Sequence, residues 1–375
     1  MKSLLINQKD LKHNIEIIKE LAKDNTSVGT SIEFKLVGVV KGNGYGLGLV
    51  EFARFLKDNG VPILAVSTVE EAVELREAGI DGVVLMLSST AVDEEIKTLI
   101  EHNITVTIGS DESARKVNEC AKKLNITVRA NLAIDTGFGR YGFLYQDTDH
   151  MISVLKSLTN VHIVSTFSHF SMSFAKKEKW TRIQFKRFVD TVSILQENYI
   201  KTGHLHICNS SAFLRFPYMH LNAARIGSAF LGRILLPNEW GLKKIGVLHT
   251  NITEIKTLPK GFNVGYSNTF KTKRDSKVAI IPVGYYDGFN VHNNHDVYRF
   301  RDKLRYIYHD AKDFFTNKQL KVTIQDKKYT VMGKIGMYHM AIDITGHDEI
   351  QINDDVYLDI NPLYVDSKIK REYIE

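Results

Sequence analysis

The chain has 375 residues, which is more than one hydrophobic core usually supports, so its length predicts two domains. Hydrophobic residues make up 43% of it and charged residues 25%, as in an ordinary globular protein that is neither disordered nor membrane-embedded. The formal net charge of +6 is spread over lysine-rich segments that acids interrupt, such as residues 176–179. A nucleic-acid-binding protein more often gathers its bases on one element with aromatic residues between them, so we expect no nucleic-acid partner.

Cysteine, histidine and apolar patterning exclude further classes of protein. The two cysteines, Cys120 and Cys208, lie outside any Cys-x-x-Cys pattern, which excludes a disulfide framework and a zinc finger and fits a reducing compartment. His204 and His206 share a face at strand spacing, but no third ligand is evident nearby, so no metal site is expected. Neither a signal peptide nor a run of eighteen apolar residues occurs, which predicts a cytoplasmic protein without a membrane partner.

Short apolar, β-branched segments alternate with amphipathic ones through the first part of the chain. The intervening pieces, for example residues 67–80 and 111–124, carry apolar residues three and four apart and acidic first turns, which predicts helices. Eightfold alternation of strand and helix favours an α/β fold, a parallel (β/α)8 barrel of the TIM type, over residues 1–235. The expected strands are residues 35–40, 63–67, 82–87, 104–108, 127–134, 162–167, 204–207 and 222–226.

From residue 236 onward the periodicity changes. Segments such as "VLHTNITEIKTL" and "KVAIIPVGYYDGF" alternate apolar with polar residues between turn signals, and helical periodicity largely disappears. We therefore expect a second, mostly antiparallel β domain over residues 236–375, with residues 233–241 as the connection.

The first expected strand runs directly into Lys41 and a loop, "KGNGYGLG", with glycine at every second position from Gly42 to Gly48. Reactive groups in such a barrel sit at the carboxyl ends of strands, and a lysine partly removed from water can attack an aldehyde. The spacing gives neither the dinucleotide fingerprint G-x-G-x-x-G nor the phosphate loop G-x-x-x-x-G-K-[ST]. A strand-end lysine is more often a surface residue, but a loop open to close ligand approach favours a functional one.

The stretch "VVKGNGYGLG" resembles the cofactor-lysine motif "VVKANAYGHG" of the alanine racemase family. Further similar motifs follow in the same order along nearly the whole chain. The resemblance implies a pyridoxal 5′-phosphate-dependent racemase that interconverts L- and D-alanine, and a homodimer whose active site lies at the subunit interface. The matching motifs are "INQKDLKHNIEIIK", "DTGFGRYGF", "SHF", "HICNSSAF", "ARIGSAFLGR", "VGYSNTF", "IPVGYYDGF" and "GKIGMYHMAID".

The resemblance assigns cofactor binding to the barrel. Lys41 would hold the cofactor covalently, the Tyr45 hydroxyl would reach its phosphate, and Arg225 would face its pyridine nitrogen. Arginine carries only donors and stays protonated, so that nitrogen would remain an acceptor and electron withdrawal by the ring would be limited. The matched residues are Lys41, Tyr45, His169, Asn209, Ser210 and Arg225, with the backbone amides of Ile226 and Gly227.

Racemisation removes a proton from one face of Cα and delivers one to the other, so it calls for two bases. By resemblance these are Lys41 and Tyr266. A phenol has an ordinary pKa of about 10, so nearby positive charge must favour its ionised form, a task the resemblance gives to His169 and Arg225.

Substrate binding is assigned to Arg140 and the backbone amide of Met337, which would hold the carboxylate, and to Tyr285, which would line the entrance. The planar fork of arginine suits a carboxylate. Tyr266 and Met337 would come from the partner chain.

Several positions depart from the family pattern. Ala133 stands where members commonly carry a lysine that supports Arg140, so another group, an anion such as chloride, or a different orientation of Arg140 remains open. Tyr338 replaces an aspartate at the mouth of the substrate pocket, and Leu47 replaces a histidine. A C-terminal segment with a further phosphate-contacting tyrosine is also missing; the candidates to replace that residue are Tyr357 and Tyr364.

These departures leave alternatives open. A racemase of the same family could act on serine or another, larger amino acid. A non-catalytic pyridoxal phosphate-binding barrel would lack the β domain and a counterpart of Tyr266. A decarboxylase of related architecture normally places an acid, where this chain has Arg225, at the ring nitrogen.

Overall fold

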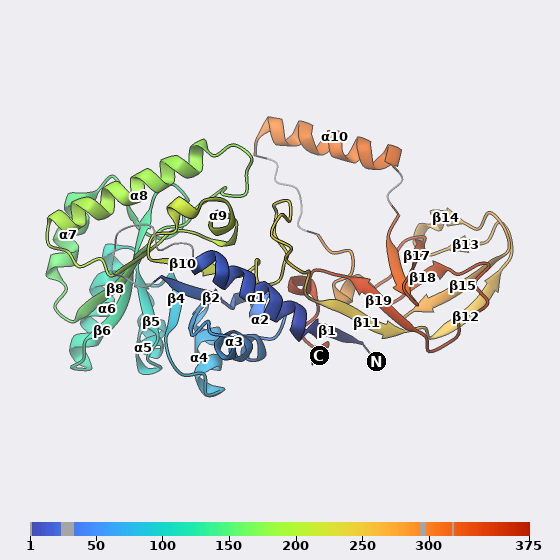
Figure 1. Ribbon diagram of the computed structural model, residues 1–375, viewed down its shortest axis with the longest axis horizontal. Coiled ribbons are helices and arrows are strands. Elements are labelled where there is room, and N and C mark those ends of the chain that lie inside the picture. Colours follow the sequence, from blue (N-terminus) through green and yellow to red (C-terminus); the bar gives the residue numbers. More distant parts are fainter. Residues whose placement is uncertain (1, 24–33, 293–297, 317–318) are drawn as a thin grey trace. The chain divides into compact units, whose positions relative to one another are not determined.

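The computed structural model describes residues 2–23, 34–292, 298–316 and 319–375, which form two compact units (Figure 1). One unit is Gln8–Ile245, and the other joins Gly246–Glu375 to the N-terminal residues through Asn7. These boundaries differ from the expected division at residue 235: segment 236–245 stays with the barrel unit, and the first strand belongs to the β unit.

The first unit is a closed barrel of parallel strands, as the sequence predicted. The strands pair in the order β2-β3-β4-β5-β6-β8-β9-β10, and β10 pairs back with β2 to close the ring. All eight predicted strands are present with ends within two residues of those expected. They are β2 (Lys35–Val39), β3 (Ile63–Val66), β4 (Val84–Ser89), β5 (Thr105–Ile108), β6 (Val128–Asp135), β8 (Val161–Phe167), β9 (His204–His206) and β10 (Ala223–Ile226), with a two-residue addition to β6, β7 (Phe143–Leu144).

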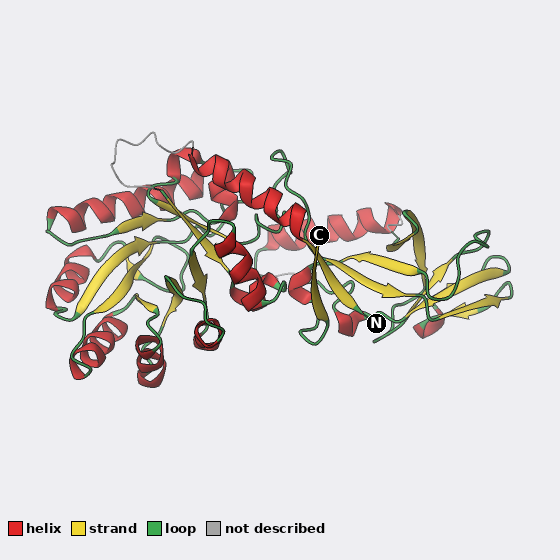
Figure 2. Cartoon of the chain, turned by 60° about the horizontal axis from the view of Figure 1, so that its bottom comes forward, coloured by secondary structure: helices red, strands yellow, loops and turns green. Residues whose placement is uncertain are grey.

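Helices surround this ring of strands (Figure 2). The long ones are α1 (Gln8–Lys23), α3 (Leu49–Asp58), α4 (Val69–Glu77), α5 (Asp93–Glu101), α6 (Asp111–Lys123), α7 (Thr148–Ser157) and α8 (Lys179–Glu197). Two short helices follow strands at their carboxyl ends, α2 (Lys41–Tyr45) after β2 and α9 (Ser210–Arg215) after β9, and the 3-10 turn η1 (Pro217–Met219) lies between α9 and β10.

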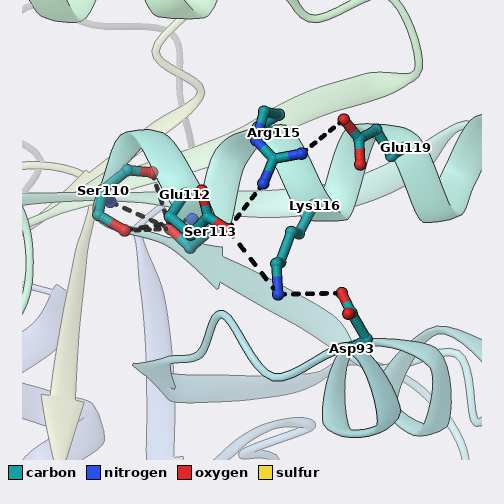
Figure 3. Close-up of polar contacts among 7 residues, drawn as sticks. All are labelled: Asp93, Ser110, Glu112, Ser113, Arg115, Lys116 and Glu119. Atoms are coloured by element: carbon teal, nitrogen blue, oxygen red, sulfur yellow. Dashed lines mark hydrogen bonds and ion pairs between the residues drawn. The ribbon is translucent and has the colours of Figure 1, made fainter.

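Helix α6 illustrates how local sequence fixes these elements (Figure 3). The Ser110 hydroxyl accepts a bond from the Ser113 amide (3.2 Å), and the Ser113 hydroxyl accepts one from the Ser110 amide (3.0 Å), which forms a capping box. On the solvent side Arg115 pairs with acids on either side of it along the helix, and Lys116 reaches Asp93 on α5 (3.3 Å). Such exposed pairs add little stability, so the cap and the buried apolar face hold α6 in place.

The second unit is a nine-stranded sheet in the order β12-β15-β18-β17-β16-β19-β11-β1-β20. Neighbouring strands in this order pair antiparallel, except β1 with β20, which confirms a mostly antiparallel domain. Its strands are β1 (Ser3–Asn7), β11 (Val247–Asn251), β12 (Glu254–Leu258), β15 (Ser276–Ile281), β16 (Lys321–Ile324), β17 (Lys327–Met332), β18 (Met340–Asp343), β19 (Asp355–Asp359) and β20 (Lys370–Ile374). A separate hairpin joins β13 (Asn263–Val264) and β14 (Phe270–Lys271), and the 3-10 turns are η2 (Tyr266–Asn268), η3 (Tyr285–Asp287) and η4 (Pro362–Tyr364).

Helix α10 (Phe300–Thr316) was not expected within the β domain. Its sequence has apolar residues at the i, i+4, i+7 and i+8 positions of a helical stripe, and all four are exposed: Phe300, Leu304, Ile307 and Tyr308. The sequence pattern could therefore have predicted this helix.

In the described part of the chain, no helix is long and apolar enough to cross a bilayer. The same residues contain no group of three or more His, Cys, Asp or Glu side chains placed to hold a metal ion.

Candidate active site

A pocket of about 380 Å³ at the carboxyl ends of the barrel strands gathers most of the residues assigned to the cofactor, together with Arg140. Parallel strands in a closed barrel end at one rim, so residues far apart in sequence meet there. Ile226 lies in β10, fully buried, between two of the lining residues. Those that line the pocket are Lys41, Tyr45, Arg140, His169, Asn209, Ser210, Arg225 and Gly227.

The residues after Lys41 form a left-handed turn, which we call the lysine turn (residues 42–45). Its four φ angles are +65° at Gly42, +53° at Asn43, +64° at Gly44 and +54° at Tyr45. L-residues avoid this region while glycine enters it freely, so alternating glycines make the turn accessible. The chain therefore follows a rigid strand with a tight reversal that starts at the lysine.

A residue that the sequence analysis missed holds this turn. One oxygen of the Glu71 carboxylate accepts bonds from the amides of Gly42 (2.5 Å) and Asn43 (3.4 Å), and the other accepts one from the Ser67 amide (3.2 Å). The Glu71 amide in turn donates to the Thr68 hydroxyl (3.3 Å). Thr68-x-x-Glu71 is a capping-box pattern, so the sequence contained a signal for the cap but none for the contact with the turn.

The environment of Lys41 favours its neutral amine. Burial is the main reason why the pKa of Lys41 is lowered, and the charge of Arg140 and then that of Arg225 lower it further, while Glu71 opposes the shift. No carboxylate in the described residues lies within ion-pair distance of the Lys41 amine. A lysine with a lowered pKa holds more of the nucleophilic, proton-accepting form near neutrality.

Donors around Ser210 and Tyr45 form a cradle for an anion. The Ser210 hydroxyl accepts bonds from the amides of Gly227 (3.1 Å) and Ala229 (3.3 Å). A Cβ at Gly227 would lie 2.5 Å from the Tyr45 hydroxyl, so only glycine allows this close packing. Burial raises the pKa of Tyr45 to about 12, which keeps its hydroxyl protonated and able to donate. With these amides bonded to its oxygen, the Ser210 hydroxyl can donate its own proton, and together with the Tyr45 hydroxyl it suits a phosphate group.

Asn209 has a supporting position beside this cradle. Its side-chain oxygen accepts bonds from the Ala212 amide (3.0 Å), which caps α9, and from the Ser173 hydroxyl (2.9 Å). Asn209 therefore fixes the start of the helix that carries Ser210.

Arg225 is a buried cation held by acceptors at the carboxyl ends of two neighbouring strands, β8 and β9. Its guanidinium donates to the Ser168 carbonyl (2.7 Å) and contacts His206 Nδ1 (2.7 Å). His206 stacks on Phe167 with ring centroids 5.3 Å apart. Burial lowers the pKa of Arg225 to about 10, so it stays charged at neutral pH. The histidine considered as a metal ligand thus orients Arg225.

His169 does not supply the positive charge that we expected of it. Burial first, then the charge of Arg225, lowers the pKa of His169 to about 3. Its Nδ1 lies 3.3 Å from Arg225 Nη2. The ring is neutral near pH 7, so Arg225 alone of these two residues is a cation there.

Arg140 belongs to a glycine-rich segment after β6, which we call the arginine loop (residues 136–142). The Asp135 carboxylate at the end of β6 accepts bonds from the amides of Gly137 (2.8 Å), Phe138 (2.8 Å) and Gly139 (2.9 Å). Three bonds to one carboxylate fix the backbone that leads to Arg140.

The Arg140 side chain rests on aromatic faces. Its guanidinium carbon lies 4.4 Å from the ring centre of Phe138 and 5.6 Å from that of Tyr141. Among the described residues its guanidinium has no hydrogen-bond acceptor or carboxylate partner. Ala133 is buried at the position where the resemblance would place a supporting lysine. Ala133 and Arg140 both border a cavity of about 20 Å³, which has room for one water-sized molecule.

The remaining assigned residues lie in the β unit. Tyr266 and Met337 line a second pocket of about 510 Å³ together with Tyr338. Tyr266 is 65% exposed, and the Met337 amide donates no hydrogen bond within the described residues. The amide of Tyr285, in η3, donates to the Gly336 carbonyl (3.1 Å), next to Met337.

Two of the departures from the family pattern lie in the β unit as well. Tyr338 packs against Tyr286 with ring centroids 5.0 Å apart, which places a second phenol beside Met337. Tyr357, in β19, packs against His249 with tilted rings, and Tyr364 lies in η4; neither lines the two pockets described above.

Comparison with known proteins gives one consistent result. Residues 6–234 match the family model described as alanine racemase, N-terminal domain, and residues 245–362 match alanine racemase, C-terminal domain. Alanine racemase of Clostridium tetani is 31% identical over 353 residues, 93% of this chain and 83% of the relative. Alanine racemase 1 of Clostridium acetobutylicum is 32% identical over 358 residues, 94% of this chain and 84% of the relative.

Comparison with solved structures gives the same family. The structure of alanine racemase from Clostridium difficile covers 100% of this chain and 96% of its own, with a TM-score of 0.85 and 26% identity. The similarity therefore includes both units of the chain.

Proposed function

Because the chain belongs to the alanine racemase family, we propose that it is a pyridoxal phosphate-dependent racemase that interconverts L- and D-alanine. The single observation that carries the proposal is the barrel pocket, where Lys41 with its lowered pKa lies beside an anion cradle and a buried arginine. Family members use pyridoxal phosphate, and these groups fit its aldehyde, phosphate and ring nitrogen.

Each part of the pocket would hold one part of the cofactor. Lys41 would bind the aldehyde, Tyr45 and the Ser210–Gly227 cradle the phosphate, and Arg225 the ring nitrogen. Bound there, the cofactor withdraws electrons from Cα of the attached amino acid and makes the Cα proton acidic. The guanidinium of Arg225 carries only donors, and its acceptors fix it in place. It therefore cannot protonate the ring nitrogen, so electron withdrawal by the cofactor ring would be limited. Limited withdrawal favours proton exchange at Cα over transamination.

Two proton carriers on opposite faces would complete the reaction. The Lys41 amine would take a proton on one face or, once protonated, return one, and the Tyr266 hydroxyl would act on the other. Since His169 is neutral near pH 7, the positive charge that favours the ionised phenol of Tyr266 would come from Arg225. Tyr266 and Met337 would come from a second copy of the chain, so the active form would be a homodimer.

Arg140 would bind the substrate carboxylate together with the Met337 amide. Its guanidinium has no protein acceptor among the described residues, so its donors are available to an anion. Tyr285 would line the entrance. The alternative substrate, serine or another larger amino acid, is supported by two observations: the cavity beside Ala133 and the aromatic Tyr338 next to Met337.

The test is D-to-L and L-to-D conversion by the purified, cofactor-loaded protein over a panel of amino acids. Alanine should give the highest kcat/KM, and Tyr266→Phe should lower it about 10²- to 10⁴-fold. Tyr199→Phe, at a tyrosine that is 94% exposed in the barrel unit, is the matched control and should match the wild type. If alanine ranks clearly below another substrate, the alanine assignment is wrong, and a protein that binds the cofactor without racemising any amino acid contradicts the enzyme itself.

A further inference from the structure

The lysine turn contains two amides that its own hydrogen bonds leave unsatisfied. Within the turn the Gly44 amide donates to the Val40 carbonyl (2.8 Å) and the Gly46 amide to the Gly42 carbonyl (3.0 Å). The amides of Gly42 and Asn43 instead donate to Glu71. The turn's unusual backbone therefore depends on an acceptor from outside it.

That acceptor comes from the next strand–helix unit of the barrel. Glu71 lies in the first turn of α4, and its second oxygen accepts from the Ser67 amide just after β3. The same residue's amide donates to the Thr68 hydroxyl. The carboxylate is thus fixed to the end of β3 and bridges it to the turn after β2.

The turn determines where two functional groups lie. Lys41 precedes it and Tyr45 ends it, and both side chains line the barrel pocket. A change in the four left-handed residues would move the amine and the phosphate-contacting hydroxyl relative to each other. The distance between these two groups has to match the distance between the aldehyde and the phosphate of a single cofactor.

We propose that Glu71 is a positioning residue for cofactor binding: by holding the amides of Gly42 and Asn43, it fixes the spacing between the Lys41 amine and the Tyr45 hydroxyl. The proposal rests on the proposed function, since it assumes that these two groups hold pyridoxal phosphate. Glu71 acts through the turn.

A carboxylate is suited to this position because it has two acceptor oxygens and no donor. In Glu71→Gln the single carbonyl oxygen can serve the turn, but the new NH2 group then meets the Ser67 amide, which is also a donor. The Gln variant should therefore keep the turn and lose the bridge in part, whereas Glu71→Ala loses both. The two substitutions give a graded test.

The experiment titrates pyridoxal phosphate into the apoprotein and follows the visible absorbance of the bound cofactor. Glu71→Ala should weaken binding about 10- to 100-fold, the effect of losing hydrogen bonds to a charged acceptor, and Glu71→Gln by less. Glu70→Ala and Glu74→Ala change exposed acids on the same helix and should bind as the wild type does.

Two further readouts separate positioning from stability. Borohydride reduction followed by peptide mapping should find a smaller share of pyridoxyl label on Lys41 in Glu71→Ala, at a temperature well below its melting point. In Glu71→Gln the loss of negative charge leaves the cations Arg140 and Arg225 unopposed at Lys41, so cofactor attachment should extend to lower pH. A purely structural Glu71 would change the melting temperature alone.

The outcomes are distinguishable. Wild-type affinity and labelling in both Glu71 variants would overturn the positioning role and leave the proposed function standing. If Glu71→Ala does not fold, Glu71→Gln decides the question. Failure of the wild-type protein to bind pyridoxal phosphate would instead contradict the proposed function, and racemisation plays no part in this assay.

Discussion

The lysine turn and the arginine loop are built alike and held differently. Each is a glycine-rich segment after a barrel strand, and in each a carboxylate accepts consecutive backbone amides. For the lysine turn that carboxylate is Glu71, from the next strand–helix unit. For the arginine loop it is Asp135, at the end of the loop's own strand.

The origin of the carboxylate determines which part of the site each segment can affect. The lysine turn is tied to its neighbour in the barrel, and the side chains at its ends are largely shielded from solvent. The backbone amides of the arginine loop are fixed by an acid of its own strand, and its first residue, Thr136, is also bonded to Ser168 and Arg187. Phe138, Arg140 and Tyr141 are exposed. Changes in the lysine turn should therefore affect cofactor binding and every later step, whereas changes in the arginine loop should affect substrate binding alone.

The largest effect is expected at Lys41. Lys41→Ala removes the amine that would hold the cofactor and move a proton, so alanine racemisation should fall by about 10³-fold or more. Polarimetry or a coupled assay of D-alanine measures this. Lys12→Ala, at an exposed lysine of α1, should retain full activity; substantial activity in Lys41→Ala would contradict the role of the lysine turn.

Opening the arginine loop should have the next largest effect. Asp135→Ala removes the acceptor of three amides, so KM for alanine should rise about 10- to 100-fold while pyridoxal phosphate affinity stays unchanged. Asp135→Asn keeps the oxygen that two of these amides share and should raise KM less.

The control for this pair is Asp149→Ala, at an exposed acid of α7. Kinetics with alanine and a cofactor titration are measured on the same preparations. Weaker cofactor binding with an unchanged KM would show that the two segments are not separate in function.

His169 lies under the arginine loop, where its ring meets the Phe138 ring edge-on with centroids 5.2 Å apart. Its titration therefore tests how the stability of this region depends on pH. Its folded-state pKa, about 3, is below the unfolded value of about 6.5, so the unfolded chain binds more protons in acid. Stability from this residue is present above pH 6.5 and is lost as pH falls toward 3, by up to about 1.4 kcal/mol per pH unit.

Chemical denaturation of the apoprotein at pH 7, 6 and 5 measures that slope. His169→Gln should reduce it, and His13→Gln, at an exposed histidine of α1, should not. An unchanged slope in His169→Gln would mean that His169 is not held neutral in the folded protein.

The smallest effect is expected at Phe138, whose ring face supports Arg140. Phe138→Leu removes an exposed cation–π contact of about 0.5–1 kcal/mol, so KM for alanine should rise about two- to fivefold with little change in kcat. Phe138→Tyr keeps the aromatic face and should behave as the wild type. Equal KM values in the Leu and Tyr variants would mean that the ring does not position Arg140.

The sequence predicted the barrel well because each of its strands is a short apolar run between helix signals. It also named eight residues that line one pocket, since the carboxyl ends of parallel strands meet at one rim. It did not identify Glu71, because a capping pattern says nothing about a turn that lies 29 residues earlier in the chain. That contact exists only because β2 and β3 are neighbours.

Long-range pairing explains the other difference. Strand β1 pairs with β11 and β20, both of which lie beyond residue 245, and its short apolar run does not reveal those partners. Helix α10, in contrast, had a visible helical spacing that the interpretation of the second domain overlooked.

The proposed attachment point of the cofactor is Lys41, placed by the lysine turn. Borohydride reduction of the pyridoxal phosphate-loaded protein, followed by proteolysis and mass mapping, tests it most directly. We expect one pyridoxyl group per chain, on the peptide that contains Lys41. A label on a different lysine, or no label in a protein that retains the cofactor's visible absorbance, would contradict it.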